Sequence, residues 1–210
     1  MKLQLALDVL TSEEAVDLVY RTREYIDIIE IGTPLIKHEG ISIVRCMKKL
    51  FPDKSLLVDL KSMDVGAYEA DFCFDAGADL VTVLGAADDR TIEGTLESAH
   101  RHGGAAVVDL INVRNKLPRL RAMKAMGADY VGIHSGIDQQ AAGASPLADL
   151  KRLSKVGTVP LAVAGGIGPD TLNAIVRYRP QIVVVGGAIT GAADPGAVAQ
   201  AMAETLRAAA

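Results

Sequence analysis

The stretch that decides the fold runs from Leu80 to His134 and reads LVTVLGAADDRTIEGTLESAHRHGGAAVVDLINVRNKLPRLRAMKAMGADYVGIH. Three short apolar runs within it end at Leu84, Asp109 and His134, and 25 residues separate each of these ends from the next. A repeated unit of strand, loop, helix and loop requires such a spacing. The runs are continuously apolar rather than alternating, which indicates parallel strands that are buried on both faces.

The same succession of apolar runs and amphipathic segments extends outward along the rest of the chain. It predicts eight strands, at residues 3–9, 27–31, 55–60, 80–84, 105–111, 130–134, 160–164 and 182–185. Eight such units predict an α/β fold, a single-domain (β/α)8 TIM barrel over residues 1–210. An open, doubly wound sheet is the alternative, but the sequence lacks the G-x-G-x-x-G turn that would favour it after the first strand.

Signals for helix starts stand between the predicted strands. Thr11 and Glu14 have the spacing of a capping box, in which each side chain bonds to the backbone N–H of the other residue. Three dipeptides each pair an N-cap residue with a proline at the first helical position, namely Thr33-Pro34, Ser145-Pro146 and Asp194-Pro195. We therefore expect a helix to begin at each of these points.

The composition excludes several classes of protein. The 22 basic and 26 acidic residues give a net charge of −4 without a Lys/Arg cluster, so we expect no nucleic-acid partner. Cys46 and Cys73 lack the spacing of a zinc or redox motif, and we expect buried, reduced thiols in a cytosolic protein. Asp8 interrupts the apolar N-terminal run, and no apolar stretch reaches the roughly 18 residues of a membrane span. We expect a cytoplasmic protein that does not contact membranes.

Polar residues recur where the predicted strands give way to loops. Their burial would be costly without partners, and the carboxyl ends of all strands of a barrel open onto one face. We therefore predict that they line one active site, and that the chain is an enzyme. These residues are Asp8, Glu30, Asp59, Lys61, Asp64, Asp109 and His134.

Two glycine pairs, Gly165-Gly166 and Gly186-Gly187, follow the seventh and eighth predicted strands. Barrels often bind phosphate at this place through backbone N–H groups and a helix N-terminus, where glycine permits close approach. The pairs therefore predict a phosphorylated substrate; flexible turns are the alternative. No Lys or Arg stands beside either pair, so such a site would depend on backbone amides and helix dipoles.

The segment Asp59-Leu60-Lys61-Ser62-Met63-Asp64 is predicted to be the chemical centre. Residues i and i+2 of a strand point the same way, so Asp59 and Lys61 would face the pocket while Leu60 packs against the helices. The two charges would keep each other ionised. Asp64 falls in the following loop, from which it would reach its own pocket or that of a neighbouring subunit. A surface salt bridge is the alternative for the pair.

Glu30 ends the strand next to that of Asp59, so the two carboxylates would bind one divalent cation. Oxygen ligands favour Mg²⁺ over Zn²⁺. A direct pair between Glu30 and Lys61 is the alternative. His134 ends the sixth predicted strand, and its titration near neutral pH suits proton transfer at a carbon next to a carbonyl. A core histidine without a catalytic role is the alternative there.

With these residues the chain resembles the orotidine-monophosphate-decarboxylase suprafamily, and within it the branch of hexulose-phosphate synthases and keto-gulonate-phosphate decarboxylases. The resemblance rests on Asp59-x-Lys61-x-x-Asp64, on the other polar strand ends and on the glycine pairs. It covers the whole chain from Leu3 onward. The similarity to the synthases of this branch is carried by four runs: LALD (5–8), IEIGTP (29–34), GIDQQ (136–140) and VAGGI (163–167).

The resemblance implies an aldehyde-lyase that joins formaldehyde to D-ribulose 5-phosphate through a Mg²⁺-stabilised enediolate and gives 3-hexulose 6-phosphate. It implies Glu30 and Asp59 as Mg²⁺ ligands, with Lys61 and Asp8 hydrogen-bonded to the sugar hydroxyls and the enediolate. His134 would remove the proton from C1. Asp64 would cross the interface of a homodimer into the partner's pocket, so that the active sites are shared.

Departures from the decarboxylase pattern favour the synthase activity. The decarboxylase is expected to carry arginines where this chain has Ile137 and Gly187, and a glutamate at Asp109. The missing arginines would supply a proton after loss of CO₂, whereas trapping formaldehyde needs a small apolar space. The decarboxylase of 3-keto-L-gulonate 6-phosphate remains the alternative.

Two further classes stay open. A ribulose-phosphate 3-epimerase would need histidines at the ends of the second and third strands, where this chain has none. A non-catalytic sugar-phosphate-binding barrel would have no reason to hold so many charged groups at its strand ends, and binding without turnover would identify it.

Overall fold

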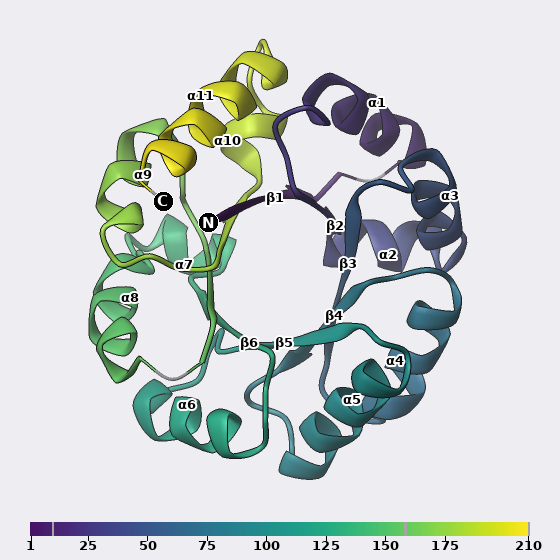
Figure 1. Cartoon of the computed structure of the whole chain (residues 1–210), viewed down its shortest axis with the longest axis vertical. Coiled ribbons are helices and arrows are strands. Elements are labelled where there is room, and N and C mark those ends of the chain that lie inside the picture. Colours follow the sequence, from purple (N-terminus) through teal and green to yellow (C-terminus); the bar gives the residue numbers. More distant parts are fainter. Residues whose placement is uncertain (10, 158, 210) are drawn as a thin grey trace.

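The computed structural model describes residues 1–9, 11–157 and 159–209. Within these ranges eight parallel strands form a closed barrel in the order in which they follow one another in the chain, and the last strand pairs with the first (Figure 1). The (β/α)8 barrel is thereby confirmed. The strands are β1 (Lys2–Leu7), β2 (Ile28–Ile31), β3 (Ser55–Ser62), β4 (Leu80–Leu84), β5 (Ala105–Asp109), β6 (Tyr130–His134), β7 (Leu161–Ala164) and β8 (Ile182–Val185).

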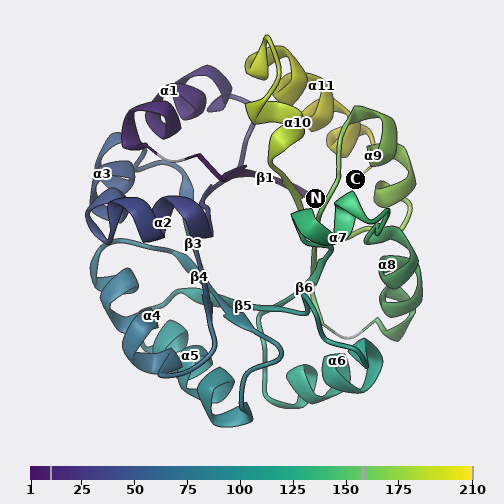
Figure 2. The same ribbon diagram turned by 180° about the vertical axis from the view of Figure 1, so that it is seen from behind.

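Helices surround the barrel and cover the outer face of the sheet (Figure 1). They are α1 (Ser12–Thr22), α2 (Thr33–Glu39), α3 (Ser42–Leu50), α4 (Gly66–Asp75), α5 (Asp89–Arg101), α6 (Lys116–Ala125), α7 (Ile137–Ala141), α8 (Leu147–Leu153), η1 (Ser154–Val156), α9 (Pro169–Val176), α10 (Gly187–Thr190) and α11 (Pro195–Ala208). The short helices α2, α7 and α10 directly follow strands and stand around one opening of the barrel (Figure 2).

Two separate groups of apolar side chains stabilise the barrel. The larger group lies between the strands and the helices, and almost all of its members are fully buried. The smaller group fills the inside of the barrel and consists of Ile28, Leu57, Leu80, Val107, Ala162 and Ile182. Because strand side chains alternate between the two faces, the sheet is buried on both sides, which explains why its strands are continuously apolar in sequence.

The strand boundaries differ from expectation by a few residues only. β1 ends at Leu7 and β5 at Asp109, so Asp8 and the residues after Asp109 lie in loops. β3 continues to Ser62. The predicted strand ends at Leu84 and His134 are confirmed, and because β5 ends at Asp109 the three strand ends keep the 25-residue repeat on which the fold prediction was based.

Two of the four predicted helix starts are confirmed. Thr11 caps α1 by accepting a hydrogen bond from the N–H of Glu14 at 3.3 Å, and Asp194 caps α11 by accepting from the N–H of Ala197 at 3.1 Å. Both bonds satisfy backbone donors that the first helical turn leaves free.

The other two predictions were wrong by one residue. Gly32 is the N-cap of α2, and Thr33 lies inside the helix because its hydroxyl donates to Asp59 instead. α8 begins after Pro146, which occupies the cap position itself. Ser145 accepts from the N–H of Leu147 at 3.3 Å and so still satisfies a donor of the first turn.

The cysteines divide between surface and core. Cys73 is fully buried in α4, as expected, but Cys46 is exposed on α3, so the prediction of a buried thiol was wrong there. Cys46 falls on the solvent side of an amphipathic helix whose buried side is formed by its neighbours Val44 and Met47. Among the described residues, no helix has the length and apolar character needed to cross a membrane.

Candidate active site

A cavity of about 40 Å³ opens at the carboxyl ends of the strands, where the polar residues gather. Its walls are formed by Gln4, Glu30, Leu57, Asp59, Lys61, Thr82, Val107, Asp109, Gly132, His134, Ala162, Ala164 and Val184. Five of the predicted site residues, Glu30, Asp59, Lys61, Asp109 and His134, are therefore brought together around one space. The chemical roles of these residues stay predictions.

The cavity is a second layer of side chains above the apolar filling of the barrel. Inward-facing residues recur every second position along a strand. In β2, Glu30 follows Ile28 by two residues, and in β3, Asp59 follows Leu57 by two residues. Strands β4, β5, β7 and β8 repeat this step. The successors of Leu80, Val107, Ala162 and Ile182 are Thr82, Asp109, Ala164 and Val184. The inner apolar layer therefore lies directly beneath the cavity and closes it toward the amino-terminal ends of the strands.

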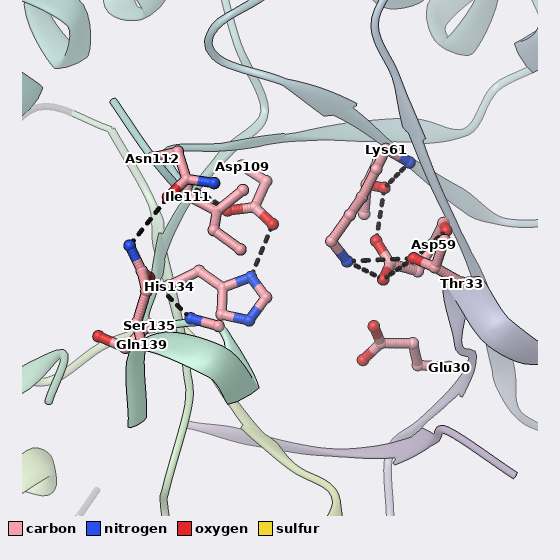
Figure 3. A network of polar contacts seen from close by, with 12 residues as sticks. Glu30, Thr33, Asp59, Lys61, Asp109, Ile111, Asn112, His134, Ser135 and Gln139 are labelled. Carbon is pink, nitrogen blue, oxygen red and sulfur yellow. Dashed lines mark hydrogen bonds and ion pairs between the residues drawn. The ribbon is translucent and has the colours of Figure 1, made fainter. Parts of the chain in front are cut away.

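Asp59 and Lys61 form an ion pair on one wall of the cavity (Figure 3). The hydroxyl of Thr33 donates to Asp59 Oδ2 at 2.7 Å, and the Lys61 ammonium donates to the same hydroxyl at 3.2 Å. Burial lowers the pKa of Lys61, but the charge and hydrogen bond of Asp59, together with the charges of Asp109 and Glu30, outweigh burial, so the pKa is raised. The surface salt bridge is excluded as an alternative, because the Asp59 side chain is 6% exposed.

Strict alternation does not explain how both side chains reach the cavity. The ladder between β3 and β4 is interrupted between Val58 and Ser62, and Lys61 has a φ of 49°. The expected outward position of Leu60 is confirmed, since it packs against the core between barrel and helices. The interruption is a β-bulge, and bulges often re-aim a side chain beside an active site.

Glu30 stands beside this pair and has few partners of its own. The Nε2 group of Gln4 donates to Glu30 Oε2 at 2.7 Å, whereas Oε1 of Gln4 is buried without a hydrogen-bond partner in the described structure. Burial and the negative charge of Asp59 raise the pKa of Glu30 to about 8. Lys61 makes no ion pair with Glu30, and its described ion pair is with Asp59.

This arrangement fits a divalent cation. Asp59 is paired with Lys61, whereas Glu30 has no cationic partner among the described residues and the negative charge of Asp59 opposes its ionisation. A cation beside both carboxylates would relieve this opposition, and oxygen donors are the ligands that Mg²⁺ prefers. No group of three or more His, Cys, Asp or Glu residues among the described side chains is placed to hold a metal. Glu30 and Asp59 would therefore supply two ligands and leave the other positions to water and substrate.

His134 and Asp109 stand on the opposite side of the cavity (Figure 3). Nδ1 of His134 lies 2.7 Å from Oδ2 of Asp109, and Oδ1 of Asp109 accepts from the N–H of Ile111 at 2.8 Å. A carboxylate at Nδ1 favours the tautomer that carries its proton there, so that Nε2 is free to accept a proton. Asp109 is buried, and its two contacts hold the carboxylate in one orientation.

Asp8 does not line the cavity but lies at its rim. It follows β1, its side chain reaches solvent, and its carboxylate lies against Gly32 and near Gly186. Partial burial and the negative charge of Asp59 raise its pKa, while Lys61 and His134 act in the opposite direction. The charges of the cavity therefore influence Asp8 although it does not touch them.

Asp64 is not brought into the cavity of its own chain. It is exposed in the loop between β3 and α4, and Oδ1 accepts from the N–H of Val65 at 2.8 Å. The sequence left two positions open for Asp64, its own pocket or that of a neighbouring subunit. The structure does not place it in its own pocket.

The glycine pairs lie at the carboxyl ends of the neighbouring strands β7 and β8, as predicted. Gly165 has a φ of 111° and packs so closely on the backbone of Ser135 that any side chain would clash. Gly187 instead faces open space. Gly168 and Gly186 are the N-caps of α9 and α10, so backbone N–H groups of both helices start beside the pairs. The geometry is suited to an anion.

Three site residues were missed by the sequence prediction. Gln4 and Thr82 contact Glu30 and Asp59 respectively, and Thr33 contacts both Asp59 and Lys61. A signal for two of them existed, since Gln4 and Thr82 are polar residues inside otherwise apolar strand runs. Thr33 gave no such signal, because its position before a proline indicated a helix cap.

Comparisons with known proteins agree on one family. The model of the Orotidine 5'-phosphate decarboxylase / HUMPS family matches residues 1–202. A 3-hexulose-6-phosphate synthase of Mycobacterium gastri is 47% identical over 200 residues, which cover 95% of this chain and 97% of the relative.

Two solved structures are similar over nearly the whole chain. The 3-hexulose-6-phosphate synthase from Salmonella typhimurium has a TM-score of 0.98 and 43% identity, with all of both chains covered. The 3-keto-L-gulonate-6-phosphate decarboxylase from Vibrio cholerae has a TM-score of 0.88 and 27% identity, with 99% of this chain and 97% of the other covered.

Proposed function

Because the chain belongs to the orotidine 5'-phosphate decarboxylase / HUMPS family, we propose that it is an aldehyde-lyase of the 3-hexulose-6-phosphate synthase type. It condenses formaldehyde with D-ribulose 5-phosphate to 3-hexulose 6-phosphate. The observation that carries the proposal is the placement of a histidine base, His134, across one cavity from the Lys61–Asp59 pair. Full-length relatives of this name support the choice of substrates.

The reaction begins with loss of the proton from C1 of the sugar phosphate. Nε2 of His134 accepts this proton, and Asp109 stabilises the charged ring that results. The ammonium of Lys61 donates to the oxygens on which negative charge develops, where a preorganised donor is most effective. C1 then attacks the carbon of formaldehyde, and the proton held by His134 is available for the new hydroxyl oxygen.

We assign the remaining groups to binding. Glu30 and Asp59 would hold Mg²⁺, which when bound would supply positive charge where negative charge develops on the substrate. Asp8, at the rim, would hydrogen-bond a hydroxyl of the sugar. The N–H groups beside Gly165, Gly166, Gly186 and Gly187 would bind the phosphate through the starts of α9 and α10.

We further propose a homodimer in which Asp64 completes the partner's cavity. Asp64 is exposed, and its sequence neighbours Met63, Val65 and Tyr68 are exposed apolar side chains. A large apolar group of this kind on the surface is typical of a protein interface. Cytoplasmic localisation and the absence of nucleic-acid or membrane partners stay predictions.

The decarboxylation of 3-keto-L-gulonate 6-phosphate is the second candidate activity, because that branch shares the fold and would share the enediolate. Position 137 separates the two. Ile137 is 72% exposed at the start of α7, three residues beyond His134, and offers an apolar side chain where the resemblance places an arginine in the decarboxylases. An apolar side chain cannot donate a proton, so the synthase activity is favoured.

One assay tests these proposals together. Purified protein is incubated with ribulose 5-phosphate, with and without formaldehyde, after EDTA treatment and again with Mg²⁺ restored. We expect consumption of the sugar phosphate to need both formaldehyde and Mg²⁺. Faster release of CO₂ from 3-keto-L-gulonate 6-phosphate would favour the decarboxylase, and binding without turnover would favour a non-catalytic barrel. Full activity without metal would contradict the metal site.

A further inference from the structure

Strand β3 carries more residues than its neighbour β4 where the two run beside the cavity. Val58 is opposite Val81, but the next pair joins Ser62 to Val83. Asp59, Leu60 and Lys61 therefore occupy the interval that Thr82 alone fills on β4. Such a bulge leaves backbone groups of the longer strand without their usual partners in the ladder.

Within this bulge Lys61 adopts a conformation that side chains avoid. Its φ of 49° lies in the left-handed region, which costs free energy for any residue other than glycine. The conformation persists only if neighbouring groups hold it. The backbone N–H of Lys61 also needs an acceptor, because a buried N–H without one is costly.

Thr82 supplies that acceptor with its side chain. Its Oγ1 atom accepts a hydrogen bond from the N–H of Lys61 at 2.9 Å, in place of a carbonyl of the ladder. The same hydroxyl donates its single proton to Oδ1 of Asp59 at 2.7 Å. Because the N–H can only donate and the carboxylate only accept, both directions are determined. Thr82 is 5% exposed, so water does not compete for either bond.

One hydroxyl thus contacts both members of the ion pair, and it does so from a neighbouring strand. Asp59 Oδ2 is already bound by Thr33 and Lys61, so Thr82 holds the other oxygen and prevents rotation of the carboxylate. Chains of hydrogen bonds of this kind strengthen one another in a buried place.

We propose that Thr82 is a positioning residue, whose hydroxyl holds the Lys61 backbone in its left-handed conformation and orients the Asp59 carboxylate that pairs with the Lys61 ammonium. The expected effect on kcat rests on the proposed function, whereas the expected effect on the Lys61 backbone does not. It is distinct from a packing role, since a packing role requires only the shape of the side chain.

Three substitutions separate the two roles. Thr82→Val keeps the shape and removes both hydrogen bonds, whereas Thr82→Ser keeps the hydroxyl and removes only a methyl group. Thr22→Val is the matched control, because Thr22 is also fully buried and its hydroxyl donates to the Leu18 carbonyl at 2.7 Å, inside α1. Thr22 stands at the end of α1 that leads into β2, away from the carboxyl ends of the strands.

We expect Thr82→Val to lower kcat by about 10- to 100-fold with a smaller change in KM, as expected for loss of hydrogen bonds to a charged group. Thr82→Ser should stay within a few-fold of the unchanged enzyme, and Thr22→Val should leave kcat unaltered. A Thr82→Val enzyme of normal kcat, or a Thr82→Ser enzyme as impaired as Thr82→Val, would overturn the proposal.

A second readout does not depend on catalysis. Hydrogen exchange at the Lys61 amide, followed by NMR, should accelerate at least ~10-fold in Thr82→Val and not in Thr82→Ser, since only the former loses the acceptor. If the unchanged protein lacks synthase activity, the proposed function fails while this measurement still decides the role of Thr82. If Thr82→Val does not fold, Thr82→Ala replaces it in both measurements with the same expectations, and unaltered exchange of Lys61 would again contradict the proposal.

Discussion

Nδ1 of His134 lies 2.7 Å from Oδ2 of Asp109, and this contact determines which ring nitrogen faces the cavity. The other carboxylate oxygen accepts from the backbone N–H of Ile111 at 2.8 Å. Asp109 therefore uses both oxygens as acceptors, and the orientation of the histidine depends on a backbone group of the loop after β5. The backbone N–H of Ile111 holds Asp109, Asp109 holds Nδ1 of His134, and Nε2 of the same ring faces the cavity.

Replacement of Asp109 by asparagine should remove this support. Ile111 and His134 are bound by different oxygens of Asp109, and asparagine has an NH₂ group in place of one of them. An NH₂ group facing Nδ1 would favour the wrong tautomer of the ring, and one facing Ile111 would lose the bond that orients the side chain. We expect Asp109→Asn to lower kcat by at least ~10²-fold in a folded protein, by analogy with acceptor loss behind other histidine bases. The assay with ribulose 5-phosphate and formaldehyde measures it.

The chain offers a matched control for that substitution. Asp129 also accepts from a backbone N–H, that of Ala106 at 2.9 Å, and lies 3.1 Å from a histidine nitrogen, that of His100. It precedes β6 and therefore stands at the opposite end of the barrel. Asp129→Asn should leave kcat unaltered. Equal activity of the Asp109 and Asp129 variants would remove His134 from the role of base.

Substitution of either member of the ion pair should abolish most of the turnover. Lys61→Ala and Asp59→Ala should each lose at least ~10²-fold in kcat, because a preorganised charge at the reacting atoms commonly contributes that much. Lys48→Ala is the control, since Lys48 pairs with Asp79 at 2.7 Å outside the cavity. Near-normal turnover of a folded Lys61→Ala or Asp59→Ala protein would return the pair to a structural role.

The raised pKa of Glu30 predicts how metal-free protein responds to pH. Its pKa of about 8 exceeds the ordinary value of 4.5, so between these values the folded state retains a proton that the unfolded chain has released. The folded state then binds more protons, and this group lowers stability as pH rises through the interval. Glu30→Gln has no such group, and Gln4 can still donate to its amide oxygen.

Urea unfolding in EDTA at pH 5 and pH 8 measures the effect. The stability of Glu30→Gln relative to the unchanged protein should increase between these values by about 1 kcal/mol or more. At pH 8, Mg²⁺ should make the unchanged protein more stable than Glu30→Gln, because the cation binds the ionised carboxylate and only the unchanged protein has one. Identical pH dependence of the two proteins would show that Glu30 is ionised without a cation.

A mixing experiment tests whether Asp64 serves the partner's cavity. Asp64→Ala and Lys61→Ala proteins should each be inactive, yet a mixed dimer would hold one cavity that keeps both groups. Exchange of subunits should restore activity, up to about half for each mixed dimer if Asp64 crosses a two-fold axis. Native mass spectrometry verifies the exchange. Exchanged but inactive mixtures would place Asp64 with its own chain, and a monomer in solution would exclude the shared site.

Much of the fold could be predicted because its signals are local. A strand buried on both faces is continuously apolar wherever it occurs, and the interval of 25 residues between Leu84, Asp109 and His134 reflects the length of one strand–helix unit. The caps Thr11 and Asp194 act within three residues of the chain. Such features follow from the sequence by itself, and the same holds for the expectation that charged residues at strand ends meet at one face.

The tertiary structure decided how those residues contact one another. Alternation along β3 predicted that Asp59 and Lys61 share a face, but the side chains reach the cavity through a bulge that depends on β4. The sequence around Thr33 predicted a helix cap, whereas in the structure its hydroxyl donates to the carboxylate of Asp59 on the neighbouring strand. Hydrogen bonds between residues far apart in the chain compete with local ones, and the register of the strands determines which of them form. The sequence therefore determined the barrel and the residues around its mouth, whereas the contacts of Gln4, Thr33 and Thr82 arose only when the strands were paired.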